Sequence, residues 1–591
     1  MSAPGRVLWV ALGAASIAFH LGLIFSGLIP NLLSRPVHML LALPWIFIFN
    51  AKTRGQMISG IILTLMGGAV TLYVALNEAS LGDQYGFLNS DLQVAVAFTL
   101  IAVVLEMARR AVGWPLPLVA LLALLYGLFG QYLPGEFGHP GIPLNSFMGN
   151  LTIAEGGIWG KLTGVSVSIV AIFVIFGAIL NAGEAGQGFM NLATAAAGRL
   201  RGGAAKVSTL SSALFGSISG SASANVASTG AITLPAMTRL GYPRSFAGAV
   251  EAVASSGGQI MPPLMGAGAF VMVELTGIPY TSIMAAALLP ALLYFVTVWL
   301  GINAFSHRYD LKGLPDEAQP DRKAVLITSA FFAVPFLVLL ERMFIGGYTP
   351  QYAATIAIVA AAALLLINGK LQFNLKTTLS RLEDACINTG KQVSMIASII
   401  LCASIIIGVL GATGLGVKIT SLILSGSGEM LWPALLLTAG ACLILGMEVP
   451  TTAAYVICIS VAGPALQQLG LAPLQAHLFV FWFALLSTIT PPVCGAVFIA
   501  AGMVGENWLK VSVKAMALGL GLYIIPLALV ANPSLIALEE TPTAAIIAFL
   551  QIGVFLGMIS YGVIAPLKPV LRALLVALGA VGIFVIPFAF N

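Results

Sequence analysis

Charged residues are scarce in this sequence of 591 residues. Only 8% are Asp, Glu, Lys or Arg, whereas a soluble globular domain carries about 25%. Hydrophobic residues make up 59%, and the mean hydropathy is +1.02. No soluble fold of this size could bury so much apolar surface. The net charge of +5 is small, and Lys and Arg lie in short clusters between apolar runs, which indicates membrane topology rather than nucleic-acid binding.

Residues that usually carry chemistry are also few. The five cysteines lie far apart and form no CxxC pair, so we interpret them as packing residues. The five histidines show no ligand spacing, so no metal site is expected beyond that of a transported cation. The segment GGAAKVST (202–209) lacks the Gly-Lys-Ser/Thr ending of a phosphate-binding loop. No catalytic residue or cofactor is predicted, and transport would have to draw on an ion gradient.

The apolar runs predict membrane-spanning helices, each of which needs about 20 residues. Four of them form an N-terminal block over residues 1–110: 7–29, 37–50, 57–77 and 92–108. Basic residues, which collect in cytoplasmic loops, follow the second and fourth spans: Lys52, Arg54, Arg109 and Arg110. Both ends of the block, and with them the N-terminus, are therefore predicted to be cytoplasmic. Arg35 and His38 lie on the wrong side for this rule.

A connecting helix and loop over 111–149 lead to a large domain over 150–591. Within it, segment 207–240 begins and ends next to basic residues, so both of its ends are predicted to be cytoplasmic. Its middle, SGSASANVASTG, is polar, and each arm has about a dozen residues, too few to span a membrane. This pattern predicts a re-entrant helical hairpin. The next helix is predicted to break at 255–263, because two glycines and two prolines interrupt it.

A second copy of this region follows 229 residues later. LPAMTRLG (234–241) matches GPALQQLG (463–470), and QIMPPLMGA (259–267) matches TITPPVCGA (488–496), without a gap between the two blocks. About five crossings between the copies place them in opposite orientations. We therefore predict an all-α polytopic membrane protein with inverted repeats, about 166–304 and 393–531, each with a re-entrant hairpin and a broken helix. Extra C-terminal helices follow over 542–591.

Inverted repeats with interrupted helices are typical of secondary transporters, whose sites lie at the repeat interface. Helix N-termini at the two tips would offer unpaired N–H groups to an anion. Carbonyl groups and Ser/Thr hydroxyls would suit a hard cation such as Na⁺. The plainer interpretation is that small polar residues only let helices pack closely, but four such segments in register make it the weaker one.

These segments resemble the membrane component of the tripartite ATP-independent periplasmic (TRAP) transporters. SGSASANVASTGAITLPAM with EAVASSGGQIMPP is similar to the family's first hairpin and broken helix, and STITPPVCGAVFIAAG to the matching element of the second half. The resemblance covers roughly 150–590. Residues 1–110 resemble the small membrane subunit, so the composite is similar to fused permeases that usually work with TAXI-type binding proteins. Many relatives have an acidic residue where this chain has Asn225, which leaves the number of coupling ions open.

The resemblance implies an elevator-type transport domain beside a scaffold in the bacterial inner membrane. A periplasmic binding protein of the TAXI type would deliver a small organic acid, a carboxylate, and cations, Na⁺ or alternatively H⁺, would move inward with it. It implies a set of ion-binding candidates: Ser219, Ser221, Asn225, Gly258, Gln259, Gly446, Thr451, Thr488 and Thr490. It also implies a set of substrate contacts: Ser223, Asn225, Ser256, Gln259, Thr451 and Thr452.

Two acidic residues are candidates for proton coupling, because an acid inside a membrane is a functional hypothesis by default. Glu448 lies at the second tip, where a structural pairing is equally open, and Glu251, in the first broken helix, is the weaker candidate.

Other classes stay open at this stage. A self-sufficient di- or tricarboxylate–cation symporter can share the hairpin plan, although the N-terminal block argues against it. An intramembrane enzyme acting on lipids would need a His/Asp or Ser/Lys constellation, which is not seen, and a gated channel would fit the paired broken helices less well.

Overall fold

The computed structural model describes residues 3–446 and 449–585, and this part of the chain is helical without any β-strand. Within these residues, eleven helices are long and apolar enough to cross a membrane. The predicted class, an all-α polytopic membrane protein, is confirmed.

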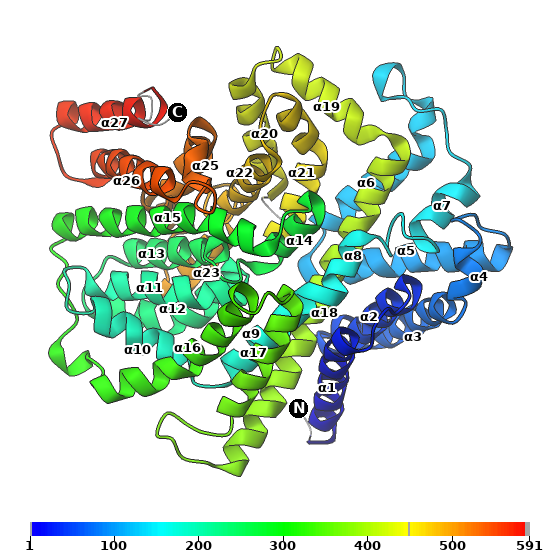
Figure 1. Cartoon of the computed structure of the whole chain (residues 1–591), viewed down its shortest axis with the longest axis horizontal. Coiled ribbons are helices and arrows are strands. Elements are labelled where there is room, and N and C mark those ends of the chain that lie inside the picture. The colour runs from blue at the N-terminus through cyan, green and yellow to red at the C-terminus, as the bar shows by residue number, and fades with distance from the viewer. Residues whose placement is uncertain (1–2, 447–448, 586–591) are drawn as a thin grey trace.

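The N-terminal block consists of helices that pack side by side (Figure 1). Their bounds, including the two helices that follow the block, are α1 Ala3–Phe25, α2 Asn31–Pro44, α3 Arg54–Leu76, α4 Glu78–Gly82, α5 Asp91–Val112, α6 Pro115–Phe129 and α7 Leu144–Thr152. A π-helical turn, Trp45–Phe49, extends α2. The first helix ends four residues earlier than predicted, because Gly27 adopts a left-handed φ of 75° and Pro30 follows.

Arg35 and His38, which break the charge rule, are both buried. Arg35 Nη1 lies 3.2 Å from the Glu155 carboxylate and also donates to the Trp159 carbonyl oxygen. His38 hydrogen-bonds His20 and Ser166. These side chains join the N-terminal block to the large domain, so they do not report on loop orientation.

The first repeat contains a helical hairpin and a broken helix. Its bounds are α8 Lys161–Val165, a π-helical turn Ser166–Val170, α9 Ala171–Ala182, α10 Ala185–Ala197, α11 Gly203–Ser219, α12 Ala222–Arg239, α13 Arg244–Gly257, α14 Gly266–Thr276 and α15 Tyr280–Arg308. The hairpin is α11 and α12, and the broken helix is α13 and α14.

The hairpin arms are longer than the predicted dozen residues. Helix α11 has 17 residues and α12 has 18, and only Gly220 and Ser221 separate them. Most of the polar stretch assigned to the tip is therefore helical, because hydroxyl groups there satisfy backbone carbonyls within the helix. Thr229 Oγ1 donates to the Asn225 carbonyl oxygen at 2.8 Å, and Ser217 Oγ to that of Leu214 at 2.8 Å.

Three helices connect the repeats, and two close the chain. Their bounds are α16 Arg322–Phe344, α17 Pro350–Leu364, α18 Leu375–Thr413, α26 Pro542–Ile564 and α27 Pro569–Phe584. The second repeat contains α19 Leu415–Gly426, α20 Leu431–Gly446, α21 Thr451–Gln468, α22 Pro473–Leu486, α23 Gly495–Val504, α24 Trp508–Leu518 and α25 Gly521–Ala531.

The helices of the two repeats keep the register of the sequence match. Helix α12 begins at Ala222 and α21 at Thr451, 229 residues later, and the two have the same length. Helices α13 and α22 begin and end with the same offset. The chain therefore builds a hairpin followed by a broken helix twice.

Helix α18 runs through the middle of the molecule (Figure 1). It packs against α1, α2, α5 and α6 of the N-terminal part and against α9 of the first repeat. The two repeats also contact each other, since α13 packs against α23 and α24. One continuous apolar core includes residues of all these parts.

Candidate functional site

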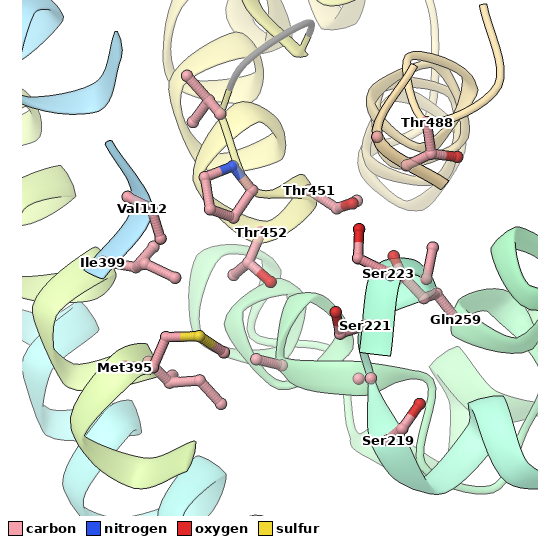
Figure 2. A pocket seen from close by; sticks show the side chains of 18 of the residues that line it. Val112, Ser219, Ser221, Ser223, Gln259, Met395, Ile399, Thr451, Thr452 and Thr488 are labelled. Carbon is pink, nitrogen blue, oxygen red and sulfur yellow. The ribbon is translucent and has the colours of Figure 1, made fainter. Parts of the chain in front are cut away.

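A cavity of about 730 Å³ lies where the two hairpin tips face α18 and the junction of α5 and α6. Pockets for small ligands usually have a volume of about 300–1,000 Å³. The hairpins and broken helices form one wall of the cavity, and the long helix α18 contributes to the other (Figure 2).

The first hairpin brings its tip and the start of α12 to the cavity through Ser219, Gly220, Ser221 and Ser223. The turn requires glycine, because Gly220 has a φ of 62° and a Cβ there would lie 3.0 Å from the Cα of Gly266. Ser221 caps α12 by accepting a hydrogen bond from the N–H of Ala224 at 3.3 Å. Other N–H groups of this first turn have no partner within the helix.

The second hairpin presents the equivalent turn of α21. Pro450, Thr451 and Thr452 line the cavity, and no side chain caps this helix. Ser221, Ser223, Thr451 and Thr452 lie close together around one space (Figure 2). Two helix N-termini with hydroxyl groups thus face the same cavity, and the positive end of a helix dipole favours an anion.

The opposite wall is apolar. Val112 from the end of α5 and Met395 and Ile399 from α18 lie across from the hydroxyl groups (Figure 2). Phe173 and Phe270, whose rings stack at 4.2 Å between centroids, also line the cavity. A ligand in this cavity would therefore meet polar groups on one side and hydrocarbon on the other.

The structure brings many of the predicted site residues together. Eight of them line the cavity: Ser219, Ser221, Ser223, Gln259, Gly446, Thr451, Thr452 and Thr488. Ser256 is buried next to it, and its hydroxyl lies 2.8 Å from that of Thr488. Glu448 lies outside the described residues.

Four predicted residues do not line the cavity. Asn225 is fully buried one turn inside α12, where its amide donates to the Ser212 carbonyl oxygen at 2.9 Å. Gly258 packs against Gly216, since a Cβ on it would lie 2.5 Å from the Gly216 Cα. The Thr490 hydroxyl lies 2.8 Å from that of Tyr523. Glu251 is buried among hydroxyl groups behind the hairpin.

Sequence reasoning missed several lining residues. Ser487 could have been found, because it is the repeat partner of Gly258, 229 residues later, and lines the cavity. Gln392 could have been noticed as a polar residue in an apolar helix. The hydrophobic wall leaves no such signal, because Met395 and Ile399 look like any other membrane-span residues until α18 is placed.

Charged side chains are absent from the cavity as far as the described residues define it. An ionised ligand would have to be stabilised there by hydroxyl and amide groups, by helix N-termini and by ions bound with it. The geometry offers hydrogen-bond donors and acceptors but no arrangement of a nucleophile with a base, so it suits binding rather than bond cleavage.

The fold and this cavity define a multi-pass membrane protein of the transporter class. A family model described as "Tripartite ATP-independent periplasmic transporter, DctM component" matches residues 99–544. The chain belongs to this family of TRAP transporter large permeases. Membership implies a periplasmic substrate-binding protein as partner and a membrane location, and the resemblance predicted from the hairpin motifs is confirmed.

Curated relatives point to the same family. The C4-dicarboxylate TRAP transporter large permease of Pseudomonas aeruginosa is 26% identical over 57% of this chain and 77% of its own length. The ectoine/5-hydroxyectoine large permease of Ruegeria pomeroyi is 24% identical over 67% of this chain and 90% of its own. The sialic acid TRAP permease SiaT of Haemophilus influenzae is 22% identical over 60% and 56%.

Proposed function

We propose that this protein takes up a small organic anion of the carboxylate type across the bacterial inner membrane, driven by a cation gradient. A separate periplasmic binding protein of the TAXI type delivers the substrate. The N-terminus faces the cytoplasm, and the N-terminal block and α18 belong to the scaffold against which the two hairpins move as an elevator.

The cavity between the hairpin tips carries this proposal. Two helix N-termini and at least four hydroxyl groups face one space, from Ser221, Ser223, Thr451 and Thr452. Such groups stabilise a carboxylate without a lysine or arginine. The permease relatives named for a C4-dicarboxylate and for sialic acid support an organic acid as the substrate class.

Cations are proposed to bind close to the substrate, at the hairpin tips and the breaks of α13 and α22. Ser219, Gln259 and Thr488 bring side-chain oxygens to the cavity there, and Gly446 brings a backbone carbonyl. Oxygen ligands of this kind suit a hard cation. A cation bound next to the carboxylate would also balance its charge, and Na⁺ is the expected ion, with H⁺ as the alternative.

The test is uptake of labelled organic acids into proteoliposomes that contain the purified permease. Each acid is offered with and without the co-encoded binding protein, under a Na⁺ gradient, a proton gradient or no gradient. Uptake that requires the binding protein and one gradient supports the proposal. Uptake at full rate by the permease alone would contradict it and favour a self-sufficient symporter.

A further inference from the structure

The buried carboxyl group of Glu251 lies behind the first hairpin, outside the cavity, and it is surrounded by hydroxyl groups. Its Oε2 accepts from Ser208 Oγ at 2.7 Å and from Thr233 Oγ1. Its Oε1 accepts from Ser212 Oγ at 3.2 Å, from Ser255 Oγ at 3.3 Å and from Thr229 Oγ1. We call Glu251 and these five residues the hydroxyl cage.

The cage is assembled from three helices and excludes solvent. Ser208 and Ser212 come from α11, Thr229 and Thr233 from α12, and Ser255 and Glu251 from α13. Every member is buried, and Glu251 itself is 0% exposed. Among the described residues, no Lys, Arg or His forms an ion pair with Glu251.

Charged groups do occur on the helices packed around the cage, but they make other contacts. Lys206 of α11 lies over the Trp299 ring, Lys514 of α24 donates to Ser245 Oγ, and Lys510 of α24 pairs with Glu506. Two arginines stand at the ends of the helices that carry the cage: Arg239 at the end of α12 and Arg244 at the start of α13. On α15, the last turn carries His307 and Arg308. The carboxyl group thus faces hydroxyls only.

The second repeat shows that this packing does not require an acid. The residue 229 positions after Glu251 is Val480, which is fully buried in α22. Thr229, Thr233 and Ser255 correspond to Cys458, Ala462 and Ala484, all buried, and Ser208 and Ser212 correspond to Leu437 and Ala441. Helices α21 and α22 pack against each other as α12 and α13 do. A buried ionisable group that the twin omits indicates a function, since apolar residues usually replace such a group without loss of stability.

The hydrogen-bond geometry allows the carboxyl group to change its protonation state in place. As a carboxylate it accepts from all five hydroxyls. When protonated, it can donate to Thr229 or Thr233, because each of these hydroxyls has a second acceptor for its own hydrogen. Thr229 Oγ1 lies 2.8 Å from the Asn225 carbonyl oxygen, and Thr233 Oγ1 lies 3.0 Å from that of Thr229. Only hydroxyl hydrogens need to rotate, since a hydroxyl is both donor and acceptor.

The arrangement favours a proton over a metal cation. The hydroxyl oxygens are distributed around the two carboxylate oxygens, three on Oε1 and two on Oε2. A Na⁺ or Ca²⁺ site would instead need oxygens that converge on a common point next to the carboxylate.

The cage is also connected to the cavity. Ser255, a cage member, precedes Ser256, whose hydroxyl lies 2.8 Å from that of the cavity residue Thr488. On α12, Thr229 Oγ1 lies 3.4 Å from Asn225 Oδ1, and the turn before Asn225 lines the cavity. A change of charge at Glu251 therefore reaches both the first hairpin and the break of α13.

We propose that the hydroxyl cage is a proton-binding site of the transport domain, in which Glu251 binds and releases one proton during the transport cycle. The role in the cycle rests on the proposed function, whereas proton binding itself does not. The site is separate from the ion candidates at the hairpin tips.

Infrared difference spectroscopy on the full-length permease in proteoliposomes tests proton binding without any substrate. A pH step should produce a carbonyl band of a buried carboxylic acid that is lost in Glu251→Gln and kept in the control Glu274→Gln, an exposed acid of α14. Persistence of the band in Glu251→Gln, or a wild-type spectrum without one, would overturn the proposal. If Na⁺ replaces the pH step at constant pH, the site binds a metal cation and the proposal fails as well.

Two cage variants keep the test decisive if Glu251→Gln does not fold. Thr233→Val and Ser208→Ala retain the acid but remove one hydrogen bond each, so both should move the band, and an unmoved band would overturn the assignment. In transport assays, the ratio of uptake with and without a proton gradient should fall to about one in Glu251→Gln, since a gradient cannot act on a site that no longer binds the proton. Loss of the binding-protein requirement, by contrast, would contradict only the proposed function.

Discussion

The two hairpins of this protein share a helical register but differ in what they bury. In the first, α11, α12 and α13 enclose a carboxyl group and five hydroxyls. In the second, α21 and α22 meet through Val480, Cys458, Ala462 and Ala484. The second hairpin has a polar pair elsewhere, Tyr455 and His477, whose equivalents in the first hairpin are Val226 and Gly248.

This difference separates what the fold requires from what it tolerates. Helix bounds and tips are the same in both copies, and both tips deliver hydroxyl groups to the cavity. The polar groups inside each hairpin are not shared, so they are not needed to form it. Substitutions that exchange features between the hairpins therefore show which differences matter.

The largest effect is expected when an acid is placed in the second hairpin. Val480→Glu puts a carboxyl group where none of the five surrounding hydroxyls exists, so it should destabilise the protein by about 3–5 kcal/mol. Thermal unfolding of the purified protein in detergent measures this. The control, Glu251→Val, should cost much less, and equal losses would show that the cage does not stabilise its acid.

A bulky residue at the first break should have the next largest effect. A Cβ on Gly258 would lie 2.5 Å from the Gly216 Cα and 2.8 Å from the Ser212 carbonyl oxygen, which are backbone atoms that cannot move aside. Gly258→Leu should therefore cost about 1–3 kcal/mol or more. The repeat partner already carries a side chain, so Ser487→Ala serves as the tolerated control in the same unfolding assay.

Removal of the polar pair from the second hairpin should have a moderate effect. The Tyr455 hydroxyl lies 2.7 Å from His477 Nδ1, and both residues are buried. Tyr455→Phe should destabilise the protein by about 1–3 kcal/mol, because it leaves a buried ring nitrogen without its partner. Tyr455→Phe combined with His477→Leu should recover part of the loss. A double variant worse than the sum of the single variants would contradict this account.

The smallest effect is expected at the helix caps. Ser221→Ala removes the side-chain cap of α12 and should cost about 0.5–2 kcal/mol. The second hairpin begins with Pro450 and has no side-chain cap to lose, so Pro450→Ala should change stability less. Melting temperatures of the two variants, compared with the wild type, give the result. A larger loss for Pro450→Ala would mean that the two tips are held by different interactions.

Much of the fold could be predicted because the repeat is written in the residues. The double prolines and the Pro-Ala and Leu-Gly pairs recur at one offset, and α12 and α21 begin and end in that register. The tip itself was less predictable. Asn225 looks like part of a polar loop, but it is helical and buried, since hydroxyl groups can return their hydrogens to the backbone of a helix.

The candidate site divides in the same way. Polar residues at a helix break, such as Ser221, Gln259 and Thr451, stand out in an apolar sequence, and the structure places them around one cavity. The apolar wall from α18 does not stand out, and neither does the importance of Glu251, which its sequence neighbours alone made the weaker of two acids. Its five hydroxyl partners come from three helices and lie up to 43 positions away.

The sequence by itself determined that this chain is a polytopic membrane protein built from two matching halves, because hydrophobic length and glycine and proline positions act locally along the chain. Only the tertiary structure decided which polar residues meet. Segments distant in the sequence had to pack before Glu251 acquired its hydroxyl cage and before the hairpin tips acquired an apolar wall to face. Those encounters depend on helix packing, which no local pattern encodes.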